Sequence, residues 1–190
     1  MLRKTSIITV ACLVIFAAFV SPVFAIDQDA LAKESEEYCA STAKSEPTSP
    51  STIVAKVNEA AKLLSVEGRE AFPKFKGKGS PFIFDGTYIW IHTLENSEML
   101  MHPIKYKMEG QNYTSMKDVK GKRFFVTINR LVKEKGEGWV EYYWPIPGTK
   151  ENVRKVSFVK GVKLPDGTDV VLGSGIYNAN ETELAKLEIH

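Results

Sequence analysis

The feature that most constrains this fold is a change of hydrophobic period near residue 82. Upstream of it, apolar residues recur at helical spacing, as Ile53, Val57 and Leu64 do. Downstream, aromatic and β-branched residues gather in short runs separated by turn signals, such as the Pro-Asp-Gly of residues 165–167. Helices followed by consecutive strands with short connections favour an α+β fold with an antiparallel sheet.

The same patterns predict individual elements. Helices are expected at residues 27–44, 51–67 and 122–133. Strands are expected at residues 87–94, 98–102, 138–144, 153–164 and 168–177, which gives a five-stranded sheet with a long N-terminal helix. Ser51 or Thr52 is the expected N-cap of the second helix. The polar stretch 104–119, which contains Tyr113, is interpreted as a long functional loop or lid, and the tail 178–190 as a short helix.

The N-terminus has the order of a secretory signal. Arg3 and Lys4 precede an apolar run at residues 7–20, and Val23 and Ala25 stand at the minus three and minus one positions. Residues 1–25 are therefore predicted to be a cleaved signal peptide, which places the mature chain in the periplasm or outside the cell. An uncleaved membrane anchor is the alternative, although the run is shorter than the roughly 20 residues of a spanning helix.

Charge and cysteine content limit the remaining chain. The sequence has 25 Lys and Arg against 23 Asp and Glu, so removal of Arg3 and Lys4 balances the two. Without a concentrated basic patch, we expect no nucleic-acid partner. Cys12 leaves with the signal, so Cys39 cannot form an internal disulfide and is interpreted as a packing residue. Residues 26–50 are expected to form a helical segment, 51–177 one domain and 178–190 a tail.

Lys155 is the first candidate for a binding site. Strand alternation places it on a mostly uncharged face of residues 153–164, with Val153, Ser157 and Val159. A lysine there is costly to bury unless an anion pairs with it, and a ligand carboxylate would serve. The alternative is that this face is solvated at Lys155. On the preceding strand, Tyr142 and Trp144 share a face with Val140.

Other candidates surround the same region in sequence. Trp90 and His92 share a face of the first strand, where an aromatic wall with polar handles suits a small ligand, and core packing is the alternative for Trp90. His102 either bonds a ligand or fixes the following loop, and Arg123 either grips a carboxylate or lies on the surface. The predicted ligand-binding residues are Trp90, His92, His102, Arg123, Tyr142, Trp144 and Lys155.

Catalytic and metal signatures are weak. His92, His102 and His190 have no metal-ligand spacing. Ser174 lies between two glycines but lacks the fuller pattern of a nucleophile elbow. We therefore expect no catalytic residue, no metal and no cofactor, and a hydrolase is the least favoured hypothesis.

Ordered sequence blocks resemble the single Cache domain (type 2) of bacterial receptors. The blocks span residues 52–177 and are VNEAAKLLSVEGREAF, TYIWIHTL, MLMHP, GKRFF, GEGWVEYYWP, RKVSFVKGV and VLGSGIY. Two departures stand out. The turn at residues 95–97 is Glu-Asn-Ser, where the family commonly has Asp-Gly, and Met101 replaces a small residue before His-Pro.

The resemblance implies an extracytoplasmic sensor that acts in signal transduction or chemotaxis. Its ligand, often a short carboxylate, would lie on the sheet face opposite the long helix. The family's membrane helices and signalling module are not recognised in the sequence, so we expect a free exported sensor of a small organic anion, partnered by a membrane receptor or sensor kinase. The alternative is a structural or protein-interaction module without a small-molecule site, with Trp139 and Tyr143 as an exposed docking patch.

Overall fold

The computed structural model describes residues 26–190, so the predicted signal peptide at 1–25 lies outside the described residues. Its elements are α1 (Gln28–Ser41), α2 (Pro50–Glu67), η1 (Gly68–Phe75), β1 (Ile83–Phe84), β2 (Thr87–Tyr88), β3 (Trp90–Thr93), β4 (Met99–Met101), η2 (Tyr106–Met108), α3 (Phe124–Lys135), β5 (Glu137–Pro145), β6 (Asn152–Lys163), β7 (Asp169–Tyr177) and α4 (Glu181–Leu184). Between residues 26 and 190, no helix combines the length and apolar character that a membrane crossing requires.

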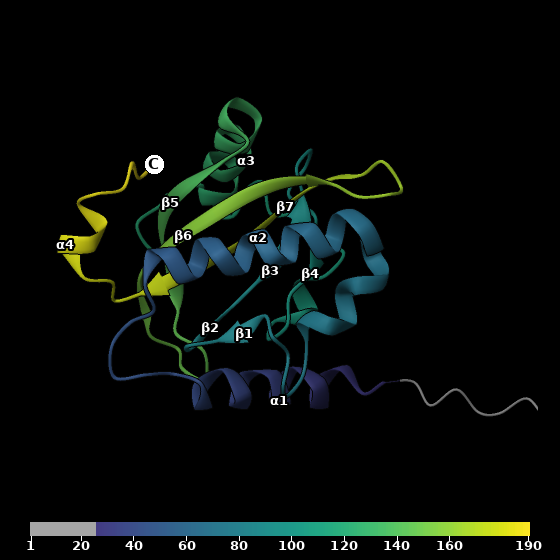
Figure 1. Cartoon of the computed structure of the whole chain (residues 1–190), viewed down its shortest axis with the longest axis horizontal. Coiled ribbons are helices and arrows are strands. Elements are labelled where there is room, and N and C mark those ends of the chain that lie inside the picture. The colour runs from purple at the N-terminus through teal and green to yellow at the C-terminus, as the bar shows by residue number, and fades with distance from the viewer. Residues whose placement is uncertain (1–25) are drawn as a thin grey trace, which may run out of the picture.

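The main sheet has five strands in the order β4-β3-β7-β6-β5, and every neighbouring pair is antiparallel (Figure 1). The long strands β5, β6 and β7 follow one another along the chain, and the two turns that connect them place them side by side. The predicted α+β fold with a five-stranded antiparallel sheet is confirmed.

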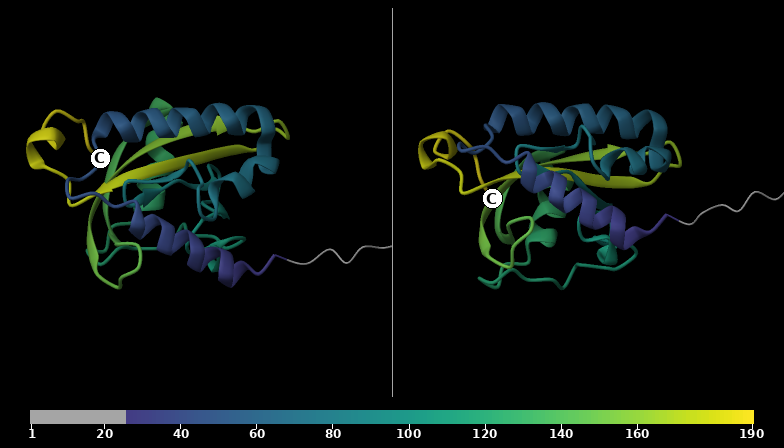
Figure 2. Two further views of the ribbon diagram at one scale, coloured as in Figure 1. Left: turned by 60° about the horizontal axis from the view of Figure 1, so that its bottom comes forward. Right: turned by 90° about the horizontal axis from the view of Figure 1, so that it is seen from below.

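Helices cover both faces of this sheet (Figure 2). On one face α2 buries Ile53, Val57 and Leu64 against sheet residues such as Leu172. On the other face α3 buries an apolar side that includes Ile128. Because successive side chains of a strand point to opposite faces, each long strand contributes to both cores. The face opposite α2 is the one on which the site lies.

The N-terminal helix α1 packs away from the main sheet, against β1 and η2. Its first turn is capped by Asp27, whose carboxylate accepts hydrogen bonds from the backbone N–H groups of Asp29 and Ala30. Cys39 lies on its inner side, fully buried beside Tyr88. That position agrees with the packing role expected for this cysteine.

Two local predictions were wrong. The single strand expected at residues 87–94 is divided, because β2 pairs with β1 in a separate hairpin and only β3 joins the main sheet. Asp85 and Gly86 turn this hairpin with φ of 46° and 74°, and the Asp-Gly pair is a signal for such a turn. Helix α2 is capped by Ser49, since Pro50 fits the first helical position where no N–H is needed.

The docking patch proposed for Trp139 and Tyr143 is also wrong. Trp139 is 8% exposed, because it packs against Phe158 in the core on the α2 side. The chain beyond α4 returns to β5, where Ile189 forms a parallel bridge with Trp139 and the N–H of His190 donates to the Trp139 carbonyl at 3.0 Å. Tyr143 is half-buried.

Candidate ligand-binding site

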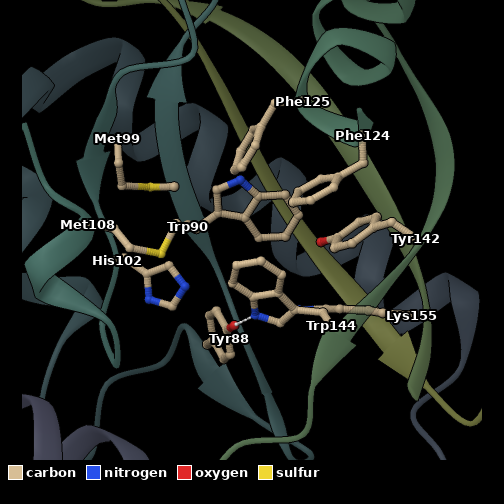
Figure 3. Close-up of a pocket in the computed structure, with 10 residues that line it drawn as sticks. All are labelled: Tyr88, Trp90, Met99, His102, Met108, Phe124, Phe125, Tyr142, Trp144 and Lys155. Atoms are coloured by element: carbon tan, nitrogen blue, oxygen red, sulfur yellow. Dashed lines mark hydrogen bonds between the residues drawn. The ribbon is translucent and has the colours of Figure 1, made fainter. Parts of the chain in front are cut away.

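A small cavity opens on the sheet face opposite α2, beside the start of α3 (Figure 3). Strands β2 to β6, the segment after β4, η2 and α3 all contribute to it. Its lining residues are Tyr88, Trp90, Met99, His102, Met108, Phe124, Phe125, Tyr142, Trp144 and Lys155. About 10 Å³ is open to the centre of a water-sized sphere, which is room for about one water molecule. The cavity therefore admits only a very small guest unless its walls move.

Lys155 is the only charged residue in this lining. It lies on β6 opposite Tyr142 of β5 and Tyr177 of β7, and its exposed fraction is 0%. The ammonium Nζ is 4.5 Å from the ring centroid of Tyr88, 4.6 Å from that of Tyr177 and 5.2 Å from that of Trp90. Three aromatic faces thus surround the cation, and their ring quadrupoles stabilise it.

The ammonium of Lys155 nevertheless lacks a hydrogen-bond partner anywhere in residues 26–190. Burial lowers its pKa from 10.5 to about 7, because the charged form loses its hydration. Aromatic faces replace only part of that hydration, and the N–H donors stay unmatched. An anion with oxygen acceptors is the kind of group that would satisfy them.

The aromatic hydroxyls and indoles near Lys155 are mostly paired within the protein. Trp144 Nε1 donates to the Tyr88 hydroxyl at 2.9 Å, and the Tyr142 hydroxyl lies 3.1 Å from Ser157 Oγ. Burial raises the pKa of both tyrosines, so both stay neutral. Tyr177 differs, since its buried hydroxyl has no hydrogen-bond partner within the described chain. Two unmatched polar groups therefore lie close to each other, Lys155 and Tyr177.

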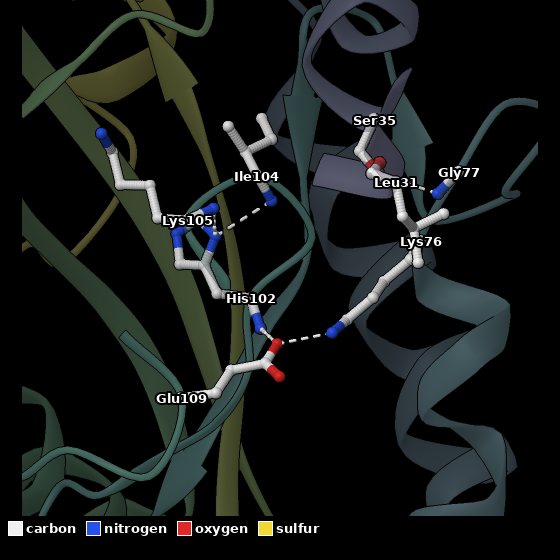
Figure 4. Close-up of polar contacts among 8 residues, drawn as sticks. All are labelled: Leu31, Ser35, Lys76, Gly77, His102, Ile104, Lys105 and Glu109. Carbon is white, nitrogen blue, oxygen red and sulfur yellow. Dashed lines mark hydrogen bonds and ion pairs between the residues drawn. The ribbon is translucent and has the colours of Figure 1, made fainter. Parts of the chain in front are cut away.

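His102 contributes a fixed neutral imidazole. Its Nδ1 accepts from the backbone N–H groups of Ile104 at 3.3 Å and Lys105 at 3.0 Å, so the proton is on Nε2 (Figure 4). Burial, followed by the charge of Lys155, holds the pKa of His102 well below its usual range. The backbone N–H of His102 donates to Glu109 Oε1 at 2.8 Å, and Lys76 pairs with the same oxygen at 2.7 Å. His102 can thus offer one N–H donor from a rigid position.

Five of the seven predicted site residues meet in the cavity, namely Trp90, His102, Tyr142, Trp144 and Lys155. His92 is buried behind Trp90, and Arg123 is exposed just before α3 begins, so neither lines the cavity. Tyr113 lies outside the lining and packs against Phe125 at a centroid distance of 5.8 Å. Which residues contact a ligand stays a prediction.

Sequence reasoning left out five lining residues. Tyr88 shares a strand face with Trp90 and could have been added by alternation. Phe124 and Phe125 were expected on the apolar side of a helix, and nothing in that pattern indicated a cavity. Met99 and Met108 come from a short strand and an irregular segment, where periodicity carries little information about direction.

Comparison with known proteins gives a family. A family model described as a Cache domain matches residues 36–189. A solved structure of a Cache chemosensory domain, described as the structural basis for carboxylic acid recognition, is 31% identical and covers 77% of this chain and 92% of its own, with a TM-score of 0.51. A methyl-accepting chemotaxis protein from Vibrio parahaemolyticus RIMD 2210633 has the same fold, at 18% identity, 67% and 86% coverage and a TM-score of 0.55.

A curated relative is a chemotaxis protein. Methyl-accepting chemotaxis protein McpP of Pseudomonas putida is 36% identical over 90 residues, which are 47% of this chain. The match spans only 16% of that protein's length.

Proposed function

The chain belongs to the Cache domain family, and on this premise we propose that it is an extracytoplasmic sensor domain that binds a short organic anion, such as a carboxylate. Members of this family are ligand-binding signalling modules, so we propose binding and not catalysis as its activity. The observation that carries the proposal is the ammonium of Lys155, fully buried and without a hydrogen-bond partner in the described residues.

The ligand would lie with its carboxylate toward Lys155. One oxygen accepts from Nζ, in a charge-assisted hydrogen bond, and the Nε2–H of His102 is the donor proposed for the other. Trp90, Tyr142 and Trp144 supply apolar walls for a short alkyl group. The cavity has room for about one water molecule, so its walls would have to move even for a short acid, and we propose an acid of few carbon atoms for that reason. The carboxylic acid recognition described for a 31% identical Cache domain supports this class of ligand.

We further propose a role in signal transduction. The similarity to chemotaxis receptors supports a chemosensory output, with a membrane receptor or a sensor kinase as the protein partner.

Isothermal titration calorimetry tests the ligand class. Acetate, propionate and butyrate are titrated into the folded protein, with propylamine and alanine as controls for charge. We expect saturable binding of at least one acid and none of the amine. Lys155→Met should weaken it by roughly tenfold or more, as for a lost charge-assisted hydrogen bond. Lys160→Met, on the same strand but paired with Glu137, is the matched control. Absence of saturable heat for every acid would contradict the proposal.

The small size of the cavity favours a second candidate function. With room for about one water molecule, the scaffold could serve as a protein-interaction module without a small-molecule ligand. The same titrations separate the two functions, because only the sensor binds an acid in a manner that depends on Lys155.

A further inference from the structure

A chain of buried hydrogen bonds leads away from the cavity wall. Trp90 Nε1 donates to His92 Nδ1 at 3.2 Å. Because Nδ1 accepts, the proton of the neutral imidazole is on Nε2, which lies 2.9 Å from the Asn129 Oδ1 acceptor. Asn129 Nδ2 then donates to Ser97 Oγ at 2.8 Å. Burial lowers the pKa of His92 to about 4, so the ring stays neutral at ordinary pH. Each donor in the series thus has one acceptor.

Ser97, the last residue of this hydrogen-bond series, has an unusual backbone conformation. It lies in the turn between β3 and β4 with φ of 56°, in the left-handed region that favours glycine. This is the turn where the sequence departs from the family's Asp-Gly. Glycine would adopt the conformation without strain but has no Oγ to accept from Asn129. The hydrogen bond gives a physical reason for serine at a position where the backbone alone favours glycine.

The opposite end of the indole of Trp90 is also fixed. A Cβ placed on Gly173 of β7 would lie 2.7 Å from Trp90 Cη2 and 2.8 Å from Cζ2, so the six-membered ring rests directly on the glycine. The five-membered ring is fixed by the hydrogen bond to His92. The same indole is a wall of the cavity and lies over Lys155 Nζ.

From these contacts we infer that His92, Asn129 and Ser97 are positioning residues for Trp90, and that they hold its indole as a fixed wall of the ligand site. The inference rests on the proposed function, because it assigns these residues to the ligand site. None of the three lines the cavity, so they act through the indole.

Indole N–H resonances of ¹⁵N-labelled protein provide the test. Trp90→Phe assigns the Trp90 signal, and the signals of Trp139 and Trp144 serve as internal references. His92→Phe, which keeps an aromatic ring but removes the acceptor, should shift the Trp90 signal and accelerate its exchange with solvent. Ser97→Gly should produce a smaller effect of the same kind without loss of folding, because it relieves the backbone strain. His92→Gln, which can accept and donate, should restore part of the parent signal.

Affinity for acetate and propionate is measured on the same variants. We expect roughly tenfold weaker binding for His92→Phe and a loss of a few-fold for Ser97→Gly, with partial recovery in His92→Gln. An unchanged Trp90 signal in both His92→Phe and Ser97→Gly overturns the inference, as does a shifted signal with unchanged affinity. If the parent protein binds none of acetate, propionate and butyrate, the proposed function fails, and with it the assignment of these residues to a ligand site. The resonances still decide whether the three residues fix the indole. If His92→Phe does not fold, Ser97→Gly decides alone.

Discussion

Replacement of Lys155 by methionine should stabilise the free protein, and by an amount that depends on pH. The pKa of Lys155 is about 7 in the folded chain, and 10.5 is the ordinary value for the solvated lysine of an unfolded chain. Between these values the unfolded chain binds more protons, so the contribution of Lys155 to the free energy of unfolding rises with pH. Below about pH 7 the full penalty applies, roughly 5 kcal/mol at ~1.36 kcal/mol per pH unit. At pH 8.5 roughly 3 kcal/mol remains.

The measurement is urea denaturation followed by circular dichroism at pH 6 and pH 8.5. Lys155→Met should exceed the parent protein in the free energy of unfolding at both values, and its advantage should shrink by roughly 2 kcal/mol from pH 6 to pH 8.5. Burial raises the pKa of Cys39 and of the buried tyrosines, so these groups stay neutral at both pH values in the folded parent and variant. Burial is also the larger cause of the low pKa of His102, with the charge of Lys155 second, so the pH-dependent difference is assigned to Lys155. Lys160→Met, on the same strand, should show no such pH-dependent difference. Two results would refute the idea of an unmatched buried cation. One is a difference in the free energy of unfolding between variant and parent that does not change with pH, and the other is a variant that is less stable than the parent at both pH values.

Three other outcomes follow from the same geometry. Affinity for acetate should fall by up to tenfold per pH unit above about pH 7, since only the protonated Lys155 pairs with the anion. Calorimetry in two buffers of different ionisation enthalpy should therefore detect proton uptake on binding. An affinity that does not change from pH 6 to pH 9 would argue against Lys155 as the counter-ion. Gly173→Ala should destabilise the fold by about 1–3 kcal/mol in urea denaturation, because its Cβ meets Trp90 and Val159 at less than 3.0 Å, whereas Gly148→Ala, with open space around it but φ of 78°, tests backbone strain alone. Glu109→Gln removes the charge that pairs with Lys76, so the backbone of His102 should be held less firmly. Propionate binding should weaken a few-fold, while the urea midpoint should change little. An unchanged affinity would mean that His102 does not depend on the Glu109–Lys76 ion pair.

The overall fold could be predicted because its signals are local and repeated. Period-2 alternation over the long strands β5 and β6 sets the two faces of the sheet, and the apolar side of α2 sets its covering layer. The β1–β2 hairpin was missed because two-residue strands are too short for any period to register. Its Asp-Gly turn was the one available signal.

The site could be predicted only where strand alternation decides direction. Lys155 stood out because it is a lysine on a mostly uncharged strand face, and the structure shows that it is fully buried. His92 shares its strand face with Trp90, but alternation does not tell which residues of a face line a cavity. The contact of His92 with Asn129 of α3 places it behind the indole of Trp90. Met108 depends on how an irregular segment folds back over the sheet, which tertiary contacts determine.

The return of the chain to β5 has a consequence for assembly. An outer strand with free N–H and C=O groups invites pairing with another molecule. Here the N–H of Glu141 donates to the His190 carbonyl at 3.1 Å, Lys122 Nζ donates to the Glu141 carbonyl at 2.7 Å, and the N–H of Tyr143 donates to Asp118 at 3.0 Å. With these backbone positions occupied from within, two copies of the domain cannot extend their sheets through this part of β5. Association of such domains must therefore use other surfaces, and intermolecular strand pairing here would first require detachment of residues 189–190 and of the Lys122 and Asp118 side chains.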